Sequence, residues 1–256
     1  MEIAILHVGE APRQLREQHG RFPSWFQDSI NAIDPDIRWR EIRVIDGELL
    51  PEPRDLDAIA ITGSVFGVHD RTPWIDRLCT FVADAYNAKK KMVGICFGHQ
   101  LMAHVLGGTV GRSPGGWGIG LHRYELIGGE HLFPDGISSI AVPVSHQDQV
   151  TAPPADSQVL LRSSFTPYAG LLYGNGVGLS VQGHPEFNKS IAKLFAELRR
   201  GNPLPDDVVN RAVAGLDAPN DNLALVEGMV RFLRAAETGA RRRGQHRHDA
   251  CGRWVD

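Results

Sequence analysis

A short apolar strand that stops at a single cysteine between glycines is the feature that most constrains this chain. Residues 92–95 read Met-Val-Gly-Ile, Cys96 follows, and Gly98 precedes a helix-like run at 101–106. A strand, a tight turn that carries a nucleophile and a helix together form the thiol counterpart of a nucleophile elbow. The glycines permit a sharp turn, and a helix N-terminus behind the sulfur favours the thiolate. The pattern predicts a reactive cysteine, and the alternative is an inert buried thiol at a strand end.

Strand-like and helix-like segments alternate along the first hundred residues, which favours a parallel sheet covered by helices. The predicted strands there are 2–8, 37–44, 58–61 and 92–95, and the predicted helices are 24–33, 74–86 and 101–106. From 109 to 182 short apolar runs broken by Gly, Pro and Ser predict further strands, some antiparallel, at 121–127, 140–144, 159–162, 169–172 and 178–181. Helices resume at 190–199, 206–214 and 222–236. The sequence therefore predicts an α/β fold with a mostly parallel central sheet and a small antiparallel addition.

Composition excludes several classes of protein. The chain has 256 residues, is 42% hydrophobic and carries a formal charge of −3, which is typical of a globular protein with a large core. Its charge balance predicts no nucleic-acid partner and no membrane partner, and no apolar stretch approaches the roughly 18–20 residues of a spanning helix. The first residues lack the basic region of a signal peptide. Three scattered cysteines form neither a disulfide framework nor a zinc-ligand pair. We expect a cytoplasmic protein.

A second strand-like run supplies what a cysteine nucleophile needs. After the strand 178–181 the chain reads Gln-Gly-His184-Pro-Glu186-Phe, at the carboxyl end of that strand. Parallel α/β sheets place their sites at that edge. His184 can act as the base, and Glu186 can accept its ring N–H and fix its tautomer. The alternatives are an ordinary turn histidine and a carboxylate at a helix start.

The two motifs, Gly-Ile-Cys-Phe-Gly-His-Gln and Gln-Gly-His-Pro-Glu-Phe, together resemble the class I (triad) glutamine amidotransferases. The chain looks most like the free-standing branch similar to the amidotransferase domain of GMP synthase, a branch that includes plant-type γ-glutamyl peptidases. The resemblance covers roughly residues 1–199 and implies the flavodoxin-like fold of that family. It also implies that Cys96 is the nucleophile, His184 the general base and acid, and Glu186 the carboxylate that orients it.

Further roles follow from the same resemblance. In relatives a glycine of the loop after the third strand supplies half of the oxyanion hole, which here implies the N–H of Gly63, with the N–H of Phe97 as the second donor. The stretch 144–150 resembles a loop that lines the glutamine pocket, which implies substrate binding by Ser145 and His146. Gln100 is expected at the same end of the substrate. The glycine-rich stretch 115–120 lacks a following helix, so we expect a loop beside the site and no dinucleotide.

The expected reaction is hydrolysis of the γ-carboxamide of glutamine through a γ-glutamyl thioester on Cys96, without metal or cofactor. Ammonia would pass to an acceptor or to a separate synthetase subunit, because the chain carries no recognisable ATP-binding motif. The first alternative is a self-sufficient γ-glutamyl peptidase or hydrolase. The second is a non-catalytic regulatory binding module.

The predicted domain organisation places one amidotransferase domain at residues 1–200. A helical extension follows at 201–238. Residues 239–256 contain five arginines and are expected to be a basic, disordered tail.

Overall fold

The structure, a computed structural model, describes residues 1–174 and 176–235, which form seven α-helices, three one-turn 3-10 helices (Val44–Asp46, Pro53–Asp55 and Glu130–Leu132) and eleven strands. The helices are α1 (Arg13–His19), α2 (Phe22–Asn31), α3 (Pro73–Asn87), α4 (Phe97–Val105), α5 (Lys189–Glu197), α6 (Asp206–Gly215) and α7 (Asn222–Arg234). The first strands are β1 (Glu2–Leu6), β2 (Arg38–Ile42), β3 (Ala58–Ile61), β4 (Lys91–Ile95), β5 (Thr109–Arg112) and β6 (Gly118–Leu126). The remaining strands are β7 (Ser139–His146), β8 (Asp148–Ala152), β9 (Ser157–Arg162), β10 (Gly170–Tyr173) and β11 (Gly178–Val181).

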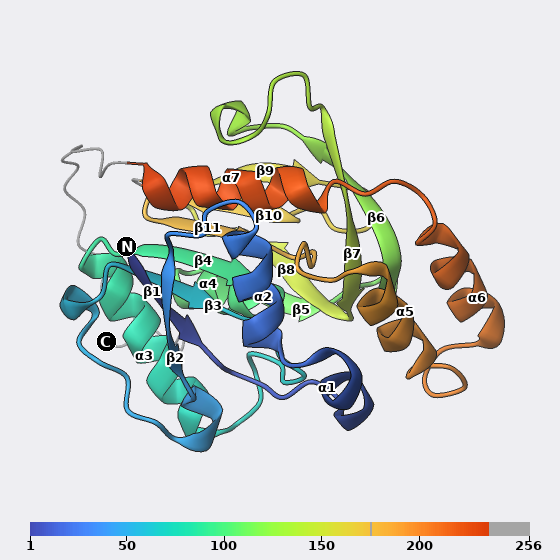
Figure 1. The fold of residues 1–256 in the computed structure, drawn as a ribbon, viewed down its shortest axis with the longest axis horizontal. Helices are drawn as coiled ribbons and strands as arrows, with labels where there is room; N and C mark the ends of the chain where they lie inside the picture. Colours follow the sequence, from blue (N-terminus) through green and yellow to red (C-terminus); the bar gives the residue numbers. More distant parts are fainter. Residues whose placement is uncertain (175, 236–256) are drawn as a thin grey trace.

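One mixed sheet runs through the molecule in the order β2-β1-β3-β4-β11-β10-β9-β6-β7 (Figure 1). From β2 to β11 each neighbouring pair is parallel, and from β11 to β7 each is antiparallel. A separate antiparallel pair joins β5 to β8. The predicted α/β class, with a parallel core and an antiparallel addition, is confirmed.

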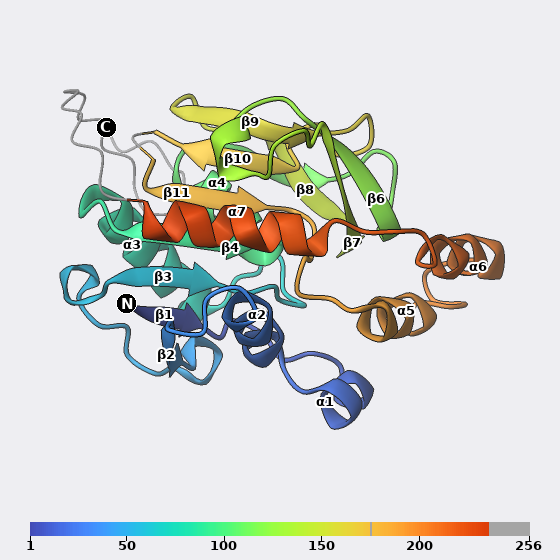
Figure 2. The same ribbon diagram turned by 45° about the horizontal axis from the view of Figure 1, so that its top comes forward.

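Helices cover both faces of the parallel strands. In Figure 2, α7 and α2 lie over one face, and α3 and α4 lie on the opposite side. Strand alternation explains this division: Ile3 and Ile5 of β1 belong to the core under α2 and α7, whereas Ala4 and Leu6 belong to the core under α3 and α4. Because both faces are buried, these strands are continuous apolar runs.

The C-terminal helix shares the main core. Leu225, Met229 and Phe232 of α7 are buried against the sheet, and Arg234 forms a bidentate ion pair with Asp34 next to α2. Residues 239–256, for which a basic tail was predicted, lie outside the described residues.

Among the α-helices and strands of the described residues, three were not predicted: α1, β5 and β8. The expectation of a loop at 144–150 is wrong, because β7 runs to His146 and β8 starts at Asp148, with only Gln147 between them. The polar residues there are typical of a loop. In the structure they form the end of β7, which pairs with β6, and the start of β8, which pairs with β5. Likewise the run 115–120 is not all loop, since β6 begins at Gly118.

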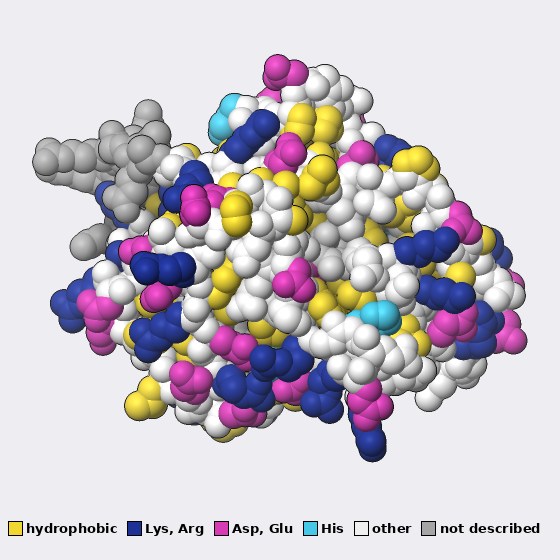
Figure 3. Space-filling view, in the orientation of Figure 1, with side chains coloured by type: hydrophobic (Ala, Val, Ile, Leu, Met, Phe, Trp, Pro, Cys, Tyr) yellow, Lys and Arg dark blue, Asp and Glu magenta, His cyan; other side chains and the backbone are white. Residues whose placement is uncertain are grey.

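Positive and negative side chains are interspersed on the face seen in Figure 3. Within the described ranges, every helix is too short or too polar to cross a membrane.

Candidate active site

Cys96 occupies a strained turn between β4 and α4. Its φ of 52° and ψ of −97° lie in a region that residues with a side chain rarely adopt. Two glycines make the turn feasible: a Cβ on Gly94 would meet backbone atoms of Gly98 at 2.7 Å, and one on Gly98 would meet the carbonyl oxygen of Ile61 at 2.4 Å. The first turn of α4 therefore lies directly against β3 and β4, with the thiol at its N-terminus.

His184 and Glu186 follow the neighbouring strand. β11 pairs in parallel with β4, with Val181 opposite Ile95, so both strands end at the same edge of the sheet. His184 Nδ1–H donates to Glu186 Oε1 over 2.7 Å, and both side chains are almost completely buried. The ring of His184 stacks on Phe187 with 3.9 Å between centroids and 11° between planes. These contacts fix both the tautomer and the orientation of the imidazole.

The electrostatic surroundings of His184 favour its protonated form. Burial on its own would lower the pKa of His184, but the carboxylate of Glu186 and the sulfur of Cys96 together raise that pKa above its ordinary value. A hydrogen bond with Cys96 acts in the same direction. The site therefore brings an imidazolium-favouring histidine to a thiol at a helix N-terminus, which is the arrangement that stabilises a thiolate.

Two glutamine side chains, Gln182 and Gln100, link the sulfur of Cys96 to the start of β8 by hydrogen bonds. No role was predicted for Gln182 from the sequence. Gln182 Nε2 donates to Cys96 Sγ over 3.5 Å. Gln100 Nε2 donates both to Gln182 Oε1 (3.2 Å) and to the carbonyl oxygen of Asp148 (2.7 Å). Gln182 lies in the same motif as His184, but only the parallel register of β11 and β4 shows that its side chain reaches the sulfur.

His99, also in the motif around Cys96, points away from this site. Its Nε2–H donates to the carbonyl oxygen of Tyr168 (3.0 Å), and its Nδ1 accepts from Ser180 Oγ (2.7 Å). Burial lowers the pKa of His99 to about 4, so the ring is neutral at physiological pH. This histidine holds α4 against β11 and against the segment that leads into β10.

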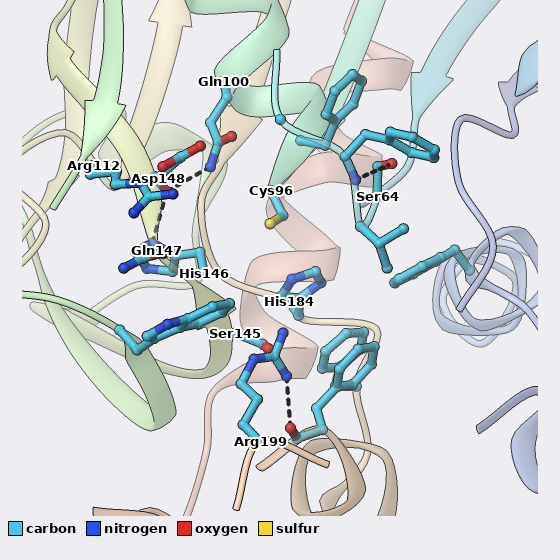
Figure 4. A pocket seen from close by; sticks show the side chains of 18 residues that line it. Ser64, Cys96, Gln100, Arg112, Ser145, His146, Gln147, Asp148, His184 and Arg199 are labelled. Carbon is cyan, nitrogen blue, oxygen red and sulfur yellow. Dashed lines mark hydrogen bonds between the residues drawn. The ribbon is translucent and has the colours of Figure 1, made fainter. Parts of the chain in front are cut away.

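A cavity of about 240 Å³ opens next to Cys96 (Figure 4). Among the predicted site residues, those that line it are Cys96, Phe97, Gln100, Ser145, His146 and His184. Glu186 is not part of the lining and reaches the cavity only through its hydrogen bond with His184. Gly63 packs against the His184 ring, because a Cβ at Gly63 would lie 3.0 Å from Cε1 of that ring.

Ser145 and His146 carry polar atoms without a partner among the described residues: the hydroxyl of Ser145 and Nε2 of His146. His146 Nδ1–H donates to the carbonyl oxygen of Asp148 (3.0 Å), which leaves Nε2 as an acceptor. Burial lowers the pKa of His146 to about 3. Neutral His146 therefore cannot serve as a second charged group.

Three charged residues and a tryptophan also line the cavity and were given no role from the sequence: Arg112, Asp148, Arg199 and Trp117. Arg112 ends β5, Asp148 starts β8, Arg199 follows α5, and Trp117 directly precedes β6. Figure 4 shows Gln100, Arg112 and Asp148 on one side of Cys96, and His184, Ser145 and Arg199 on another. Asp148 and Trp117 fall in the stretches 144–150 and 115–120, which were expected at the site without a role for either residue. No local sequence signal marks Arg112 or Arg199, since only the fold brings them to the cavity.

Comparison with known proteins agrees with this geometry. The family model of class I glutamine amidotransferases matches residues 40–196. The chain belongs to the class I glutamine amidotransferase family. Gamma-glutamyl peptidase 5 of Arabidopsis thaliana is 36% identical over 180 residues, which cover 66% of this chain and 70% of that protein. The glutamine-hydrolysing GMP synthase of Aeropyrum pernix is 37% identical over 142 residues, which cover 55% of this chain and 25% of that protein.

A solved structure shares the fold. The glutamine amidotransferase of Methylobacillus flagellatus superposes with a TM-score of 0.70 and 20% identity, and the match covers 96% of this chain and 97% of that one. The predicted family and fold are confirmed. The roles of individual site residues stay predictions.

Proposed function

We propose that this protein hydrolyses the γ-amide bond of a γ-glutamyl compound through a γ-glutamyl thioester on Cys96. The observation that carries the proposal is the meeting of a strained thiol at a helix N-terminus with the buried His184–Glu186 pair. A nucleophile, a base held by hydrogen bonds and a carboxylate that orients the base are the parts of a cysteine acyl-transfer site.

The reaction runs in two halves. The Cys96 thiolate attacks the γ-carbonyl carbon, and the resulting tetrahedral intermediate collapses when imidazolium His184 gives its proton to the departing nitrogen. The amine leaves and the thioester remains. Neutral His184 then takes a proton from water, the hydroxide attacks the thioester, and glutamate and the Cys96 thiolate are released. Glu186 keeps Nδ1–H of His184 occupied throughout, so that Nε2 is the atom that moves the proton.

The oxyanion of each tetrahedral intermediate would accept hydrogen bonds from the N–H groups of Phe97 and Gly63. Phe97 is the first residue of α4, so its N–H has no acceptor within the helix. Gly63 follows β3 by two residues and lies against the ring of His184, which supports this role for its N–H. Loss of one such donor reduces turnover about 10²–10³-fold in enzymes that use an oxyanion hole.

The glutamyl part of the substrate carries an amine and a carboxylate at its α-carbon. We assign that part to the Gln100 side of the cavity, where Asp148 offers a carboxylate and Arg112 a guanidinium. Gln100 and His146 both donate to the carbonyl oxygen of Asp148, so they hold the start of β8 in position. Ser145 adds an unpartnered hydroxyl to the wall.

A second candidate is a glutaminase that passes ammonia to a partner subunit. The similarity to the glutamine-hydrolysing GMP synthase favours it. Under this candidate glutamine is the substrate and the isolated chain turns over slowly until the partner is present.

Release of glutamate from glutamine and from γ-glutamyl amino acids, measured on the purified full chain, tests the proposal. Cys96→Ala is expected to abolish hydrolysis of every substrate that the wild type cleaves. Cys79→Ala removes a thiol of α3 that is buried in the core and does not line the cavity, and it serves as the matched control. Undiminished turnover by Cys96→Ala would overturn the proposal. Glutamine as the sole substrate would select the second candidate.

A further inference from the structure

The position of His184 determines where the leaving group of a substrate must lie. Given the proposed function, Nε2 of His184 protonates the departing nitrogen, so whatever that nitrogen carries extends along the His184 side of the cavity. Phe187 stacks on the His184 ring, and two further lining residues, Phe22 and Phe195, stack on Phe187. Arg199 extends this wall by packing on Phe195 and on Trp117. Ammonia, the leaving group of glutamine, would use none of these side chains.

Arg199 is held rigidly at this wall. Its guanidinium lies over the ring of Trp117, 4.4 Å from the centroid, and 5.7 Å from the centroid of Phe195. Nη1 donates to the carbonyl oxygen of Phe195 over 2.7 Å. Stacking on aromatic faces fixes the plane of a guanidinium and leaves its edge donors available.

Arg199 has no acidic partner within ion-pair distance in the part of the chain that the structure describes. The next residue, Arg200, pairs with both Glu197 and Asp206. Burial lowers the pKa of Arg199, and the nearby sulfur of Cys96 opposes that effect, so the guanidinium lies within electrostatic reach of the nucleophile. A half-buried cation without a counter-ion is costly unless a ligand supplies the anion.

A second unpartnered polar group lines the same cavity. The hydroxyl of Ser145 is buried and has no hydrogen-bond partner among the described residues. Figure 4 shows Ser145 and Arg199 on the side of Cys96 where His184 lies. A guanidinium and a hydroxyl together suit a carboxylate, which accepts several hydrogen bonds.

We propose that Arg199, Ser145 and Trp117 form a subsite for a leaving amine that carries a carboxylate, so that γ-glutamyl amino acids or peptides are the preferred substrates over glutamine. This inference rests on the proposed function, since it places the leaving group from the role of His184. The aromatic ring of Trp117 and the three phenylalanines favour an apolar side chain on the leaving amino acid.

A matched pair of chromogenic substrates isolates the carboxylate: γ-glutamyl-p-nitroanilide and γ-glutamyl-3-carboxy-4-nitroanilide. The two share the glutamyl part and differ in the leaving group by one carboxylate. We expect the wild type to show about 10-fold or higher kcat/KM for the carboxylated anilide, as charge-assisted hydrogen bonds are worth about that factor or more. Arg199→Gln should remove this preference, mainly through KM, and Arg199→Lys should retain part of it. Arg200→Gln is the matched control and should keep the full preference.

Three outcomes would overturn the subsite while leaving the proposed function intact. The wild type could cleave both anilides equally well. Arg199→Gln could reduce cleavage of both by the same factor, which would assign Arg199 to the glutamyl part. Cleavage of glutamine with neither anilide cleaved would exclude an extended leaving group. By contrast, failure of the wild type to release glutamate from any γ-glutamyl compound would reject the proposed function itself.

Discussion

Two buried histidines lie next to strand β11, one beside the strand and one beyond its end, and their surroundings shift their pKa values in opposite directions. His99 contacts Ser180 within the strand, and its pKa is lowered to about 4. His184 follows the end of the strand, and its pKa is raised. Burial acts against the charged form of both rings. The difference comes from the partners: a hydroxyl and a carbonyl oxygen for His99, a carboxylate and a sulfur for His184.

This contrast teaches that burial alone does not identify a proton-transfer residue. A carboxylate within hydrogen-bond distance outweighs the desolvation of an imidazole, whereas neutral partners do not. Of these two histidines, His99 therefore holds elements together, and His184 is the one that we propose for proton transfer. Three changes test this difference, in order of their expected effect on turnover.

Replacing Glu186 with Gln removes the charge that raises the pKa of His184. We expect kcat/KM for a γ-glutamyl substrate to fall about 10³-fold, because the tautomer and the imidazolium are no longer favoured. Loss of the carboxylate lowers the pKa of His184, so the ring deprotonates at lower pH. The alkaline limb of the kcat/KM profile should accordingly move to lower pH. A variant whose pH profile and turnover match the wild type would refute the role given to Glu186.

Gly63→Ala is expected to reduce turnover about 10-fold by displacing the His184 ring. The added Cβ would lie 3.0 Å from Cε1 of that ring, which cannot retreat because it stacks on Phe187. Displacement by a fraction of an ångström misaligns proton transfer. The control is Gly111→Ala in β5, where the added Cβ meets only the Thr151 methyl group at 3.8 Å. Equal activity of the two variants would contradict the close fit of Gly63 to the active histidine.

His99→Gln should change kcat/KM by no more than about threefold while lowering the free energy of unfolding by about 2 kcal/mol, since buried donors and acceptors lose their partner. The wild type should also lose stability as pH falls from 6.5 to 4. In that range His99 binds a proton in the unfolded chain but not in the folded one. Across this pH range the protonation of His99 in the unfolded chain lowers the free energy of unfolding by about 3 kcal/mol. The variant should lack this contribution. Urea titrations at several pH values measure it. A large loss of turnover at wild-type stability would give His99 a role in the reaction.

The fold and the three central residues were accessible from sequence because each depends on local pattern. Apolar runs that end in Gly-x-Cys-x-Gly and Gly-His-Pro-Glu define both the parallel strands and the side chains at their carboxyl ends. The walls of the cavity depend on long-range placement instead. Asp148 reaches the site because β8 pairs with β5, and Arg199 because α5 ends beside Trp117. Neither the pairing of β8 with β5 nor the packing of Arg199 on Trp117 produces a periodic pattern in the sequence. The polar residues of 144–150 are instead typical of a loop.

Mass spectrometry of the acid-quenched reaction tests the central claim most directly. The wild type, mixed with a γ-glutamyl substrate and quenched during turnover, should gain the mass of one glutamyl group on the peptide that contains Cys96. Hydroxylamine should remove this group, as expected of a thioester, and Cys96→Ala should never acquire it. Turnover without any adduct, or an adduct on a different residue, would contradict a covalent mechanism at Cys96.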